Sequence, residues 1–137
     1  MKNNILIIKE LLMDHIEKNT IIKSCHGKVS DKGKVLPYAV VQRGGIETTR
    51  DICNIKDIKV EFGIRIVAGS EDDLYEAIEQ ITLMWNKTGI GSLFQQLHEY
   101  NVMALSHRYD QTGLIDSGEV VGQISLFLDI RQQFRNI

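Results

Sequence analysis

Hydrophobic residues recur with two different periods along the chain, and these periods predict where its helices and strands lie. Apolar residues three or four positions apart predict one helix from about Asn4 to Lys18 and another from Ser70 to Trp85. Ser70 is a favourable N-cap, and the acids from Glu71 to Asp73 follow it at the positive end of the helix dipole. Ser92 is the expected cap of a short third helix.

Alternation of apolar and polar residues predicts the strands. It is clearest over Asp57–Val67, where Ile, Val and Phe occupy every second position. Leu36–Gln42 is expected to pair antiparallel with this strand, and Gly44-Gly45 allows a bulge or bend just after it. Two further strands are predicted at Val102–Tyr109 and Glu119–Arg131. Each long strand would place one face on the core and the other toward water.

Three polar segments between these elements are expected to be loops or turns: Ser24–Lys34, Arg50–Lys56 and Gln111–Gly118. The first contains Cys25 and His26, two adjacent side chains of metal-ligand type, but a structural zinc site needs four ligands, usually from two spaced pairs. Because no second pair has that spacing, an accessible loop pair is the favoured interpretation. The lysines of the same segment favour a solvated loop over a weak contact with DNA or an acidic partner.

The order of these elements indicates the fold class. The predicted order is helix, two or three strands, helix, short helix and two strands, which does not alternate as a doubly wound parallel fold requires. It therefore favours a single α+β domain over residues 1–137, with a four- to five-stranded antiparallel or mixed sheet and helices on one face. The apolar faces of the helices and long strands predict a core of Leu12, Ile16, Val40, Val60, Phe62, Ile64, Leu74, Ile78, Ile81, Ile124, Leu126 and Leu128.

Composition narrows the classes of function. The 137 residues carry a net charge of −2, which excludes binding driven by overall basic charge. No apolar run is long enough for a membrane span, and the N-terminus has no signal-peptide pattern. Cys25 and Cys53 form no CxxC motif, so both are expected to be free thiols in a reducing cytoplasm.

No residue pattern predicts a catalytic, cofactor or metal site. The glycine pairs lack the Walker A and dinucleotide-binding contexts, and helix capping accounts for the run Glu71–Asp73. His107, near the end of its predicted strand, is the only candidate for the polar centre of a small ligand-binding or enzymatic domain, and no partner for it is evident. The sequence therefore predicts a protein that is not an enzyme and has no cofactor.

The strand Val35–Gln42 contains a Pro-Tyr pair followed by hydrophobic residues, and it resembles a strand of phage tail-terminator and tail-completion proteins. The likeness continues through the polar segment Gly44–Lys56, the strand Ile58–Val67, and the acidic turn Gly69–Ala77 that opens a helix. It is sequence-like across about Pro37–Trp85. Elsewhere it is architectural, since the family also begins with an amphipathic helix and ends with two strands.

This resemblance implies a phage or prophage structural protein that forms a ring, typically a hexamer, capping the tail tube and joining it to the head. The implied partners are further copies of the chain, the tail-tube protein and head–tail connector proteins, with at most transient contact with DNA passing through the ring. The protein would be made in the host cytoplasm and lie at the head–tail junction of the virion. The alternatives are a head–tail connector, neck or minor capsid protein, and a small ferredoxin-like ligand-binding or enzymatic domain.

Two polar segments between long strands are the expected contacts between copies in such a ring. Arg43, Arg50 and Asp51 lie in or beside the first segment, and Asp110 and Asp116 lie in or beside the second. Opposite charges there are expected to pair between neighbours and to set register more than raw affinity. A neighbouring copy would also cover the exposed edges of the long strands.

Overall fold

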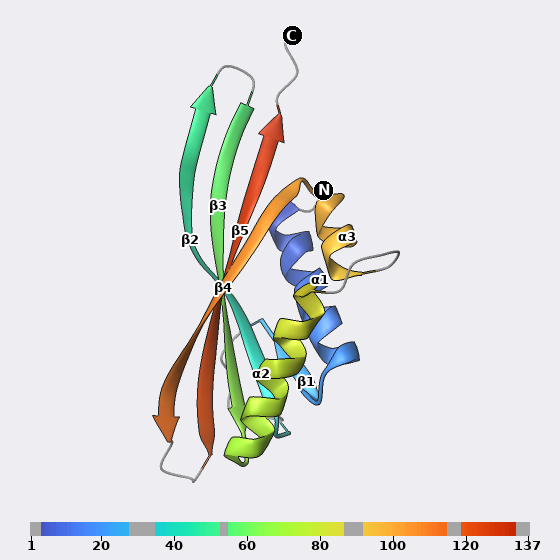
Figure 1. Ribbon diagram of the computed structural model, residues 1–137, viewed down its shortest axis with the longest axis vertical. Helices are drawn as coiled ribbons and strands as arrows, with labels where there is room; N and C mark the ends of the chain where they lie inside the picture. The colour runs from blue at the N-terminus through green and yellow to red at the C-terminus, as the bar shows by residue number, and fades with distance from the viewer. Residues whose placement is uncertain (1–3, 28–34, 53–54, 87–91, 115–118, 134–137) are drawn as a thin grey trace.

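The computed structural model of the protein describes residues 4–27, 35–52, 55–86, 92–114 and 119–133. In these ranges the chain forms three helices and five strands, which Figure 1 colours in chain order. The elements are α1 (Asn4–Asn19), β1 (Ser24–His26), β2 (Tyr38–Ile52), β3 (Ile55–Ala68), α2 (Glu71–Asn86), α3 (Leu93–His98), β4 (Val102–Leu114) and β5 (Val120–Gln133).

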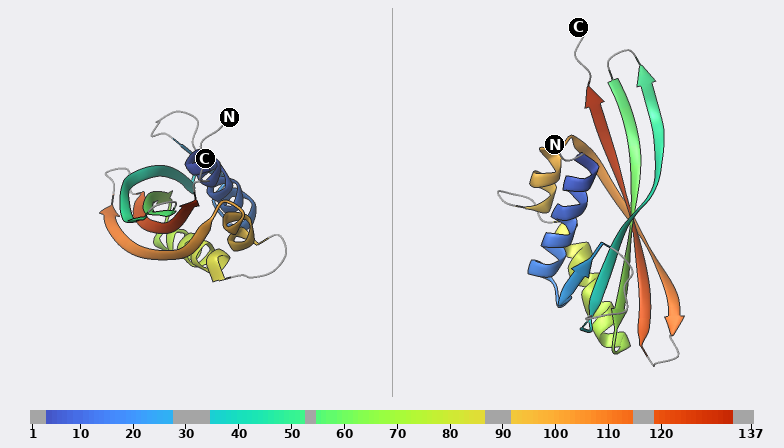
Figure 2. Two further views of the ribbon diagram at one scale, coloured as in Figure 1. Left: turned by 90° about the horizontal axis from the view of Figure 1, so that it is seen from above. Right: turned by 180° about the vertical axis from the view of Figure 1, so that it is seen from behind.

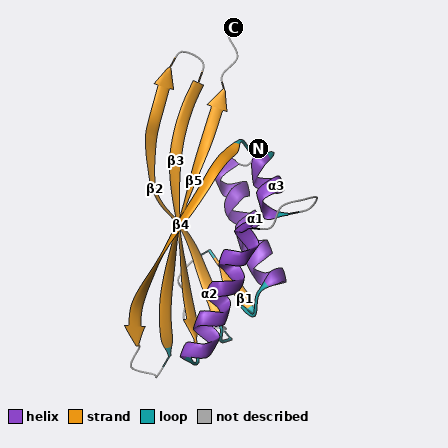
Figure 3. Ribbon diagram, viewed as in Figure 1, coloured by secondary structure: helices purple, strands orange, loops and turns teal. Residues whose placement is uncertain are grey.

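The strands form one sheet in the order β1-β2-β3-β5-β4. Neighbouring strands are antiparallel except that β1 lies parallel to β2, so the sheet is mixed. The helices pack on one face, as Figures 2 and 3 show, with α1 against β1 and β2, α2 against β3 and β5, and α3 against β4. The predicted α+β architecture, with helices on one side of a mixed sheet, is confirmed.

The core lies between the helices and the central strands β3 and β5. Every residue predicted for the core is buried except Ile78, which is partly buried and packs against the core. Val40 is buried outside the main cluster, because it pairs with Arg65 while its neighbours Ala39 and Val41 take the helix-covered face. The predicted core is therefore confirmed for α1, α2, β3 and β5, and Val40 is buried as predicted but lies outside the main cluster.

Serine caps begin the second and third helices, as the sequence predicts. Ser70 Oγ accepts a hydrogen bond of 3.2 Å from the backbone N–H of Asp73, and Ser92 Oγ caps α3 in the same way. These bonds satisfy backbone donors that have no partner inside a helix. His15 Nε2 lies 3.2 Å from Gln96 Oε1 and so joins α1 to α3.

The segment Ser24–Lys34, predicted to be a loop, begins with a strand. Ser24–His26 forms β1 and pairs in register with Tyr38–Val40, and residues 28–34 lie outside the described part of the chain. A strand this short shows no alternation that distinguishes it from a loop. Cys25 is consequently buried in the sheet, and the interpretation of Cys25 and His26 as an accessible loop pair is wrong.

Two other segments predicted to be loops continue the long strands. Within Arg50–Lys56, β2 runs on to Ile52 and β3 begins at Ile55, and within Gln111–Gly118, β4 runs on to Leu114. Residues 53–54 and 115–118 lie outside the described ranges. The first extension lies beyond the helix layer, where neither face of a strand needs apolar residues. A polar composition therefore does not indicate a turn there.

The pairing of β2 with β3 contains two irregularities. The register shifts between Arg43 and Ile46, which confirms the bulge predicted at Gly44-Gly45, and it shifts again between Thr48 and Arg50. A Cβ atom at Gly44 would lie 3.1 Å from Glu61 Oε2, so the bulge brings the backbone close to β3. Bulges of this kind bend a strand and increase its twist.

Candidate interaction surface

The outer part of the β2–β3 hairpin, residues 43–52 and 55–59, carries an exposed strand, and we call this part the arm. The ends of β2, β3 and β5 extend beyond the ends of α1 and α3 (Figure 1). Every residue of β2 from Gln42 to Ile52 is exposed. Ile46 and Ile52 are 44% and 58% exposed, which leaves two large apolar side chains without cover.

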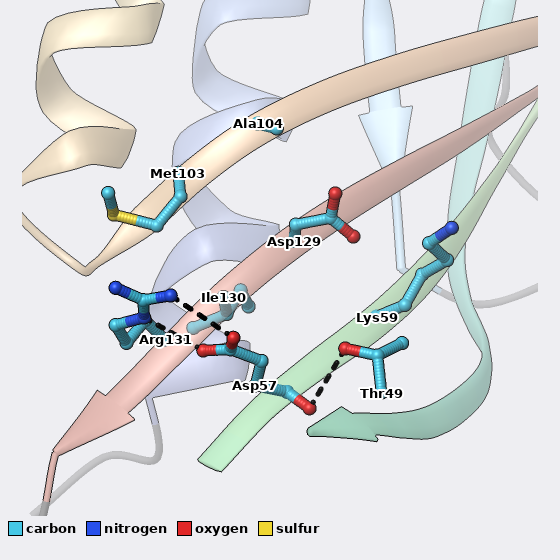
Figure 4. Close-up of a pocket in the computed structure, with 8 residues that line it drawn as sticks. All are labelled: Thr49, Asp57, Lys59, Met103, Ala104, Asp129, Ile130 and Arg131. Carbon is cyan, nitrogen blue, oxygen red and sulfur yellow. Dashed lines mark hydrogen bonds and ion pairs between the residues drawn. The ribbon is translucent and has the colours of Figure 1, made fainter. Parts of the chain in front are cut away.

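An ion cluster around Asp57 joins the three strands that meet in the arm. Arg131 of β5 donates two hydrogen bonds to the Asp57 carboxylate, from Nε to Oδ1 at 2.9 Å and from Nη2 to Oδ2 at 3.2 Å (Figure 4). Arg50 Nε lies 3.8 Å from Asp57 Oδ2, and Thr49 Oγ1 donates to the Asp57 backbone carbonyl at 3.2 Å. This two-bond geometry fixes the relative position of β3 and β5.

The same cluster shifts the pKa values of Asp57 and Arg131. The hydrogen bond from Arg131 lowers the pKa of the Asp57 carboxyl, and the charge of Arg50 acts in the same direction. The Asp57 carboxylate in turn raises the pKa of the Arg131 guanidinium. Both groups are therefore charged at neutral pH and form an ion pair between β3 and β5.

A cavity of about 370 Å³ lies beside this cluster. Its lining comes from four strands, as Figure 4 shows, and includes Lys59 of β3, Asp129 of β5 and Met103 of β4. Lys59 and Asp129 are register partners on neighbouring strands, and both are partly exposed. The cavity therefore combines an ammonium, a guanidinium, two carboxylates and an apolar wall, a lining that can accept a polar side chain of a partner protein.

Both edges of the sheet are open in the described part of the chain. β1 covers β2 only at Tyr38–Val40, and β4 pairs with β5 alone. The edge of β2 is interrupted by its two bulges, whereas the register of β4 against β5 is regular from Ala104 to Gln111. A regular, uncovered edge of this length can accept a further strand, while bulges hinder such pairing.

The structure gathers the first group of predicted contact residues on the arm. Arg43, Arg50 and Asp51 all lie on β2 and are exposed. Arg50 already lies beside Asp57 of the same chain, so its positive charge is partly neutralised within the molecule. Asp110 belongs to β4, but its side chain, like the whole of Asp116, lies outside what the structure describes.

The candidate nucleophiles and metal ligands noted in the sequence do not come together in a reactive centre within the described ranges. Burial, followed by the charge of Glu17, raises the pKa of the Cys25 thiol to about 12, so it is not a nucleophile at neutral pH. His107 lies within β4, and its ring stacks at a tilt on Trp85 with centroids 4.8 Å apart. No group of His, Cys, Asp or Glu side chains among the described residues is arranged to hold a metal ion.

Sequence reasoning missed the pairing of Asp57 with Arg131. Asp57 is the first residue of one predicted strand and Arg131 is the last residue of another. Opposite charges at these two strand ends are the sequence feature that could have indicated the pair. That signal becomes informative only when β3 and β5 are known to be neighbours. Their adjacency depends on tertiary structure and not on a local pattern.

The sequence matches no protein-family model and no curated protein. The likeness to tail terminators therefore stands on the residues between Pro37 and Trp85 and on the order of elements. Among the described helices, none has both the length and the apolar character that crossing a membrane requires.

Proposed function

We propose that the protein is a phage or prophage structural protein, with no enzymatic activity, cofactor or metal, that caps the tail tube and joins tail to head as an oligomeric ring. The observation that carries the proposal is the arm, a hairpin beyond the helix layer with exposed Ile46 and Ile52. A protein that acts through surfaces needs such a projection, whereas an enzyme needs converging reactive groups. The resemblance to tail terminators supplies the biological setting.

The two open edges support self-association in a ring. β2 and β4 run in opposite directions at opposite edges of the sheet, because each of the three intervening pairings is antiparallel. Two copies related by rotation about an axis along the strands therefore bring the β4 edge of one beside the β2 edge of the next, with the two strands antiparallel. The bulges of β2 limit any strand pairing there to the stretches between them. Such head-to-tail contacts close into a ring when the rotation permits, and a hexamer is the size that the resemblance favours.

In this proposal the surfaces have separate partners. Further copies of the chain contact its sides, the arm contacts the last layer of tail-tube protein, and the opposite end contacts head–tail connector proteins. DNA passing through the ring makes at most transient contact. The protein is made in the host cytoplasm and comes to lie at the head–tail junction of the virion.

Deleting the gene from its phage or induced prophage tests the proposal. Heads should remain intact while tails become overlong or fail to join heads, as seen by electron microscopy, and a plasmid copy of the gene should restore normal particles. Normal, infectious particles without the protein would overturn the proposal. Heads that lose their DNA while tail length stays normal would instead favour a head–tail connector.

A ligand-binding domain is the second candidate, and the cavity beside Asp57 is the observation that favours it. Lys59 and Asp129 would bind a small molecule carrying both charges, such as an amino acid. A thermal-shift screen of amino acids and related zwitterions would detect such binding. A stabilising ligand whose effect disappears in Lys59→Ala, but not in Lys56→Ala, would place this function ahead of the structural one.

A further inference from the structure

The outward side of α2 carries acidic and apolar side chains together. Asp72, Tyr75, Glu76, Glu79 and Leu83 are all exposed, with Tyr75 at 47% and Leu83 at 51%. At 100° per residue they fall on the side opposite the buried residues Leu74, Ala77, Ile81 and Met84. The helix sequence contains five acids and no lysine, arginine or histidine. We call Tyr75, Glu76, Glu79 and Leu83 the α2 outer face.

A second surface has the complementary character. Ile5, Leu6 and Lys9 of α1, together with Arg43 of β2, line a cavity of about 270 Å³ whose floor includes Phe62. We call the first four residues the root patch, because they lie where the arm leaves the helix layer. Leu6 is 44% exposed, and so is Ile46, which lies further along the arm on the same face of the sheet.

The two cations of the root patch have little to neutralise them. The Arg43 side chain is exposed and makes no hydrogen bond or ion pair within the described part of the chain. Lys9 Nζ donates to the Gly27 backbone carbonyl at 3.3 Å, which satisfies one donor, and no carboxylate among the described residues forms an ion pair with it. An exposed guanidinium beside an apolar cavity favours a partner that offers a carboxylate next to an apolar side chain.

The α2 outer face and the root patch belong to helices at opposite edges of the helix layer. α1 packs against β1 and β2 at one edge of the sheet, whereas α2 packs against β3 and β5 toward the other edge. The view from above in Figure 2 shows α1 and α2 on these two sides. One copy can therefore present both surfaces at once to two different neighbours.

We propose that the α2 outer face of one copy docks on the root patch of the next, with Tyr75 or Leu83 in the cavity and Glu76 and Glu79 near Arg43 and Lys9. The occupant is a second copy of this chain, so the proposal rests on the self-assembly described above and names the surfaces that join. The cavity is smaller than ordinary small-molecule sites and has the size of a pocket for one anchoring side chain. The contact is head-to-tail, so it propagates from copy to copy and can close a ring.

Cross-linking between two variants that each carry one exposed cysteine tests the contact directly, even when association is weak. In a Cys53→Ser background, Arg43→Cys protein is mixed with Glu79→Cys protein at high concentration and treated with a short bis-maleimide. Buried Cys25 is retained in every sample. We expect a cross-linked dimer that forms only in the mixture. The matched control uses Arg65→Cys, an exposed arginine on the other face of the sheet, in place of Arg43→Cys, and should yield at least about tenfold less product.

Charge reversal gives the second readout. Arg43→Glu alone, or Glu76→Lys with Glu79→Lys, should each lower self-association about tenfold, measured by sedimentation at low salt, because each change replaces attraction by repulsion. Combining the two changes should recover most of the lost self-association, because the opposite charges are then exchanged between the two surfaces. Circular dichroism melting of each variant separates lost contact from lost folding.

Four results would overturn the proposed contact between copies without contradicting the proposed tail function. Equal cross-linking yields with Arg65→Cys, no cross-linked dimer, or no rescue by the combined reversal would each overturn it. So would capture of the tail-tube protein or a connector by the root patch without any contact between copies. The tail function fails separately, when deletion of the gene leaves particles normal.

Discussion

The two halves of β2 differ in what surrounds them, although both pair with β3. Ala39 and Val41 lie under the helix layer and are fully buried, whereas every residue from Gln42 to Ile52 is exposed. Apolar packing holds the first half in place. Cross-strand hydrogen bonds and the Asp57 cluster hold the second. The first stretch of β2 thus stabilises the fold, and the second is available for contact with partners. Residues of the second stretch can therefore change without loss of the fold.

The largest expected contrast is between truncating a buried apolar side chain of β3 and truncating an exposed one on the arm. Phe62 is fully buried, so Phe62→Ala should lower the free energy of unfolding by about 3–5 kcal/mol. Ile46, 44% exposed on the arm, should lose no more than about 0.5 kcal/mol on replacement by Ala. Urea denaturation of both variants measures the difference. A loss below about 1 kcal/mol for Phe62→Ala would show that β3 presents its other face to the core.

Adding one methyl group in the core and one on the arm should give a smaller difference in the free energy of unfolding. A Cβ atom at Gly122 would lie 3.1 Å from Leu74 Cδ1 and from Tyr109 Oη, so Gly122→Ala should cost about 1–3 kcal/mol through overpacking. At Gly45 no atom lies within 4 Å of such a Cβ, and Gly45→Ala should change stability by about 0.5 kcal/mol or less. Thermal unfolding of the pair provides the test. Equal losses would contradict the close packing of Gly122 against Leu74 and Tyr109.

The smallest expected effect is a pH dependence confined to the arm. Because Arg131 lowers the pKa of folded Asp57 below its ordinary value of 3.8, ionised Asp57 stabilises the folded state above that pH. This contribution disappears as pH falls through the lower folded pKa, where the carboxyl is protonated in both states. Wild type should therefore exceed Asp57→Asn in stability at neutral pH and converge with it in acid.

Hydrogen exchange of arm amides, followed against pH, measures this effect where it should occur. Asp51→Asn is the matched control, since it removes a carboxylate from the same arm and leaves the pair of Asp57 and Arg131 intact. A constant difference between wild type and Asp57→Asn down to strongly acidic pH would contradict the role given to Arg131.

Local patterns predicted the parts of the fold that local physics determines. The caps at Ser70 and Ser92 and the alternation over Asp57–Val67 are confirmed, because each depends on neighbours a few residues away. β1 was missed because three residues carry no period. The ends of β2 and β4 were missed because their polar sequences resemble loops.

The candidate surface was predictable only in part, for a related reason. Exposed charges on a polar segment can be read from sequence, so Arg43 and Arg50 were found. The Asp57–Arg131 pair and the root patch combine residues far apart in the chain, and their assembly follows from the order β3-β5 and from the packing of α1 beside β2. No sequence period encodes those two facts.

Tail length in particles complemented with an arm variant tests the central claim most directly. The variant Ile46→Asp with Ile52→Asp changes only exposed side chains, so its thermal unfolding should match wild type. In a strain lacking the gene, this folded variant should leave tails overlong or unjoined in electron micrographs, while the exposed-residue control Arg65→Ala restores normal particles. Normal, infectious particles with the arm variant would contradict the claim that the arm is the surface through which this protein acts.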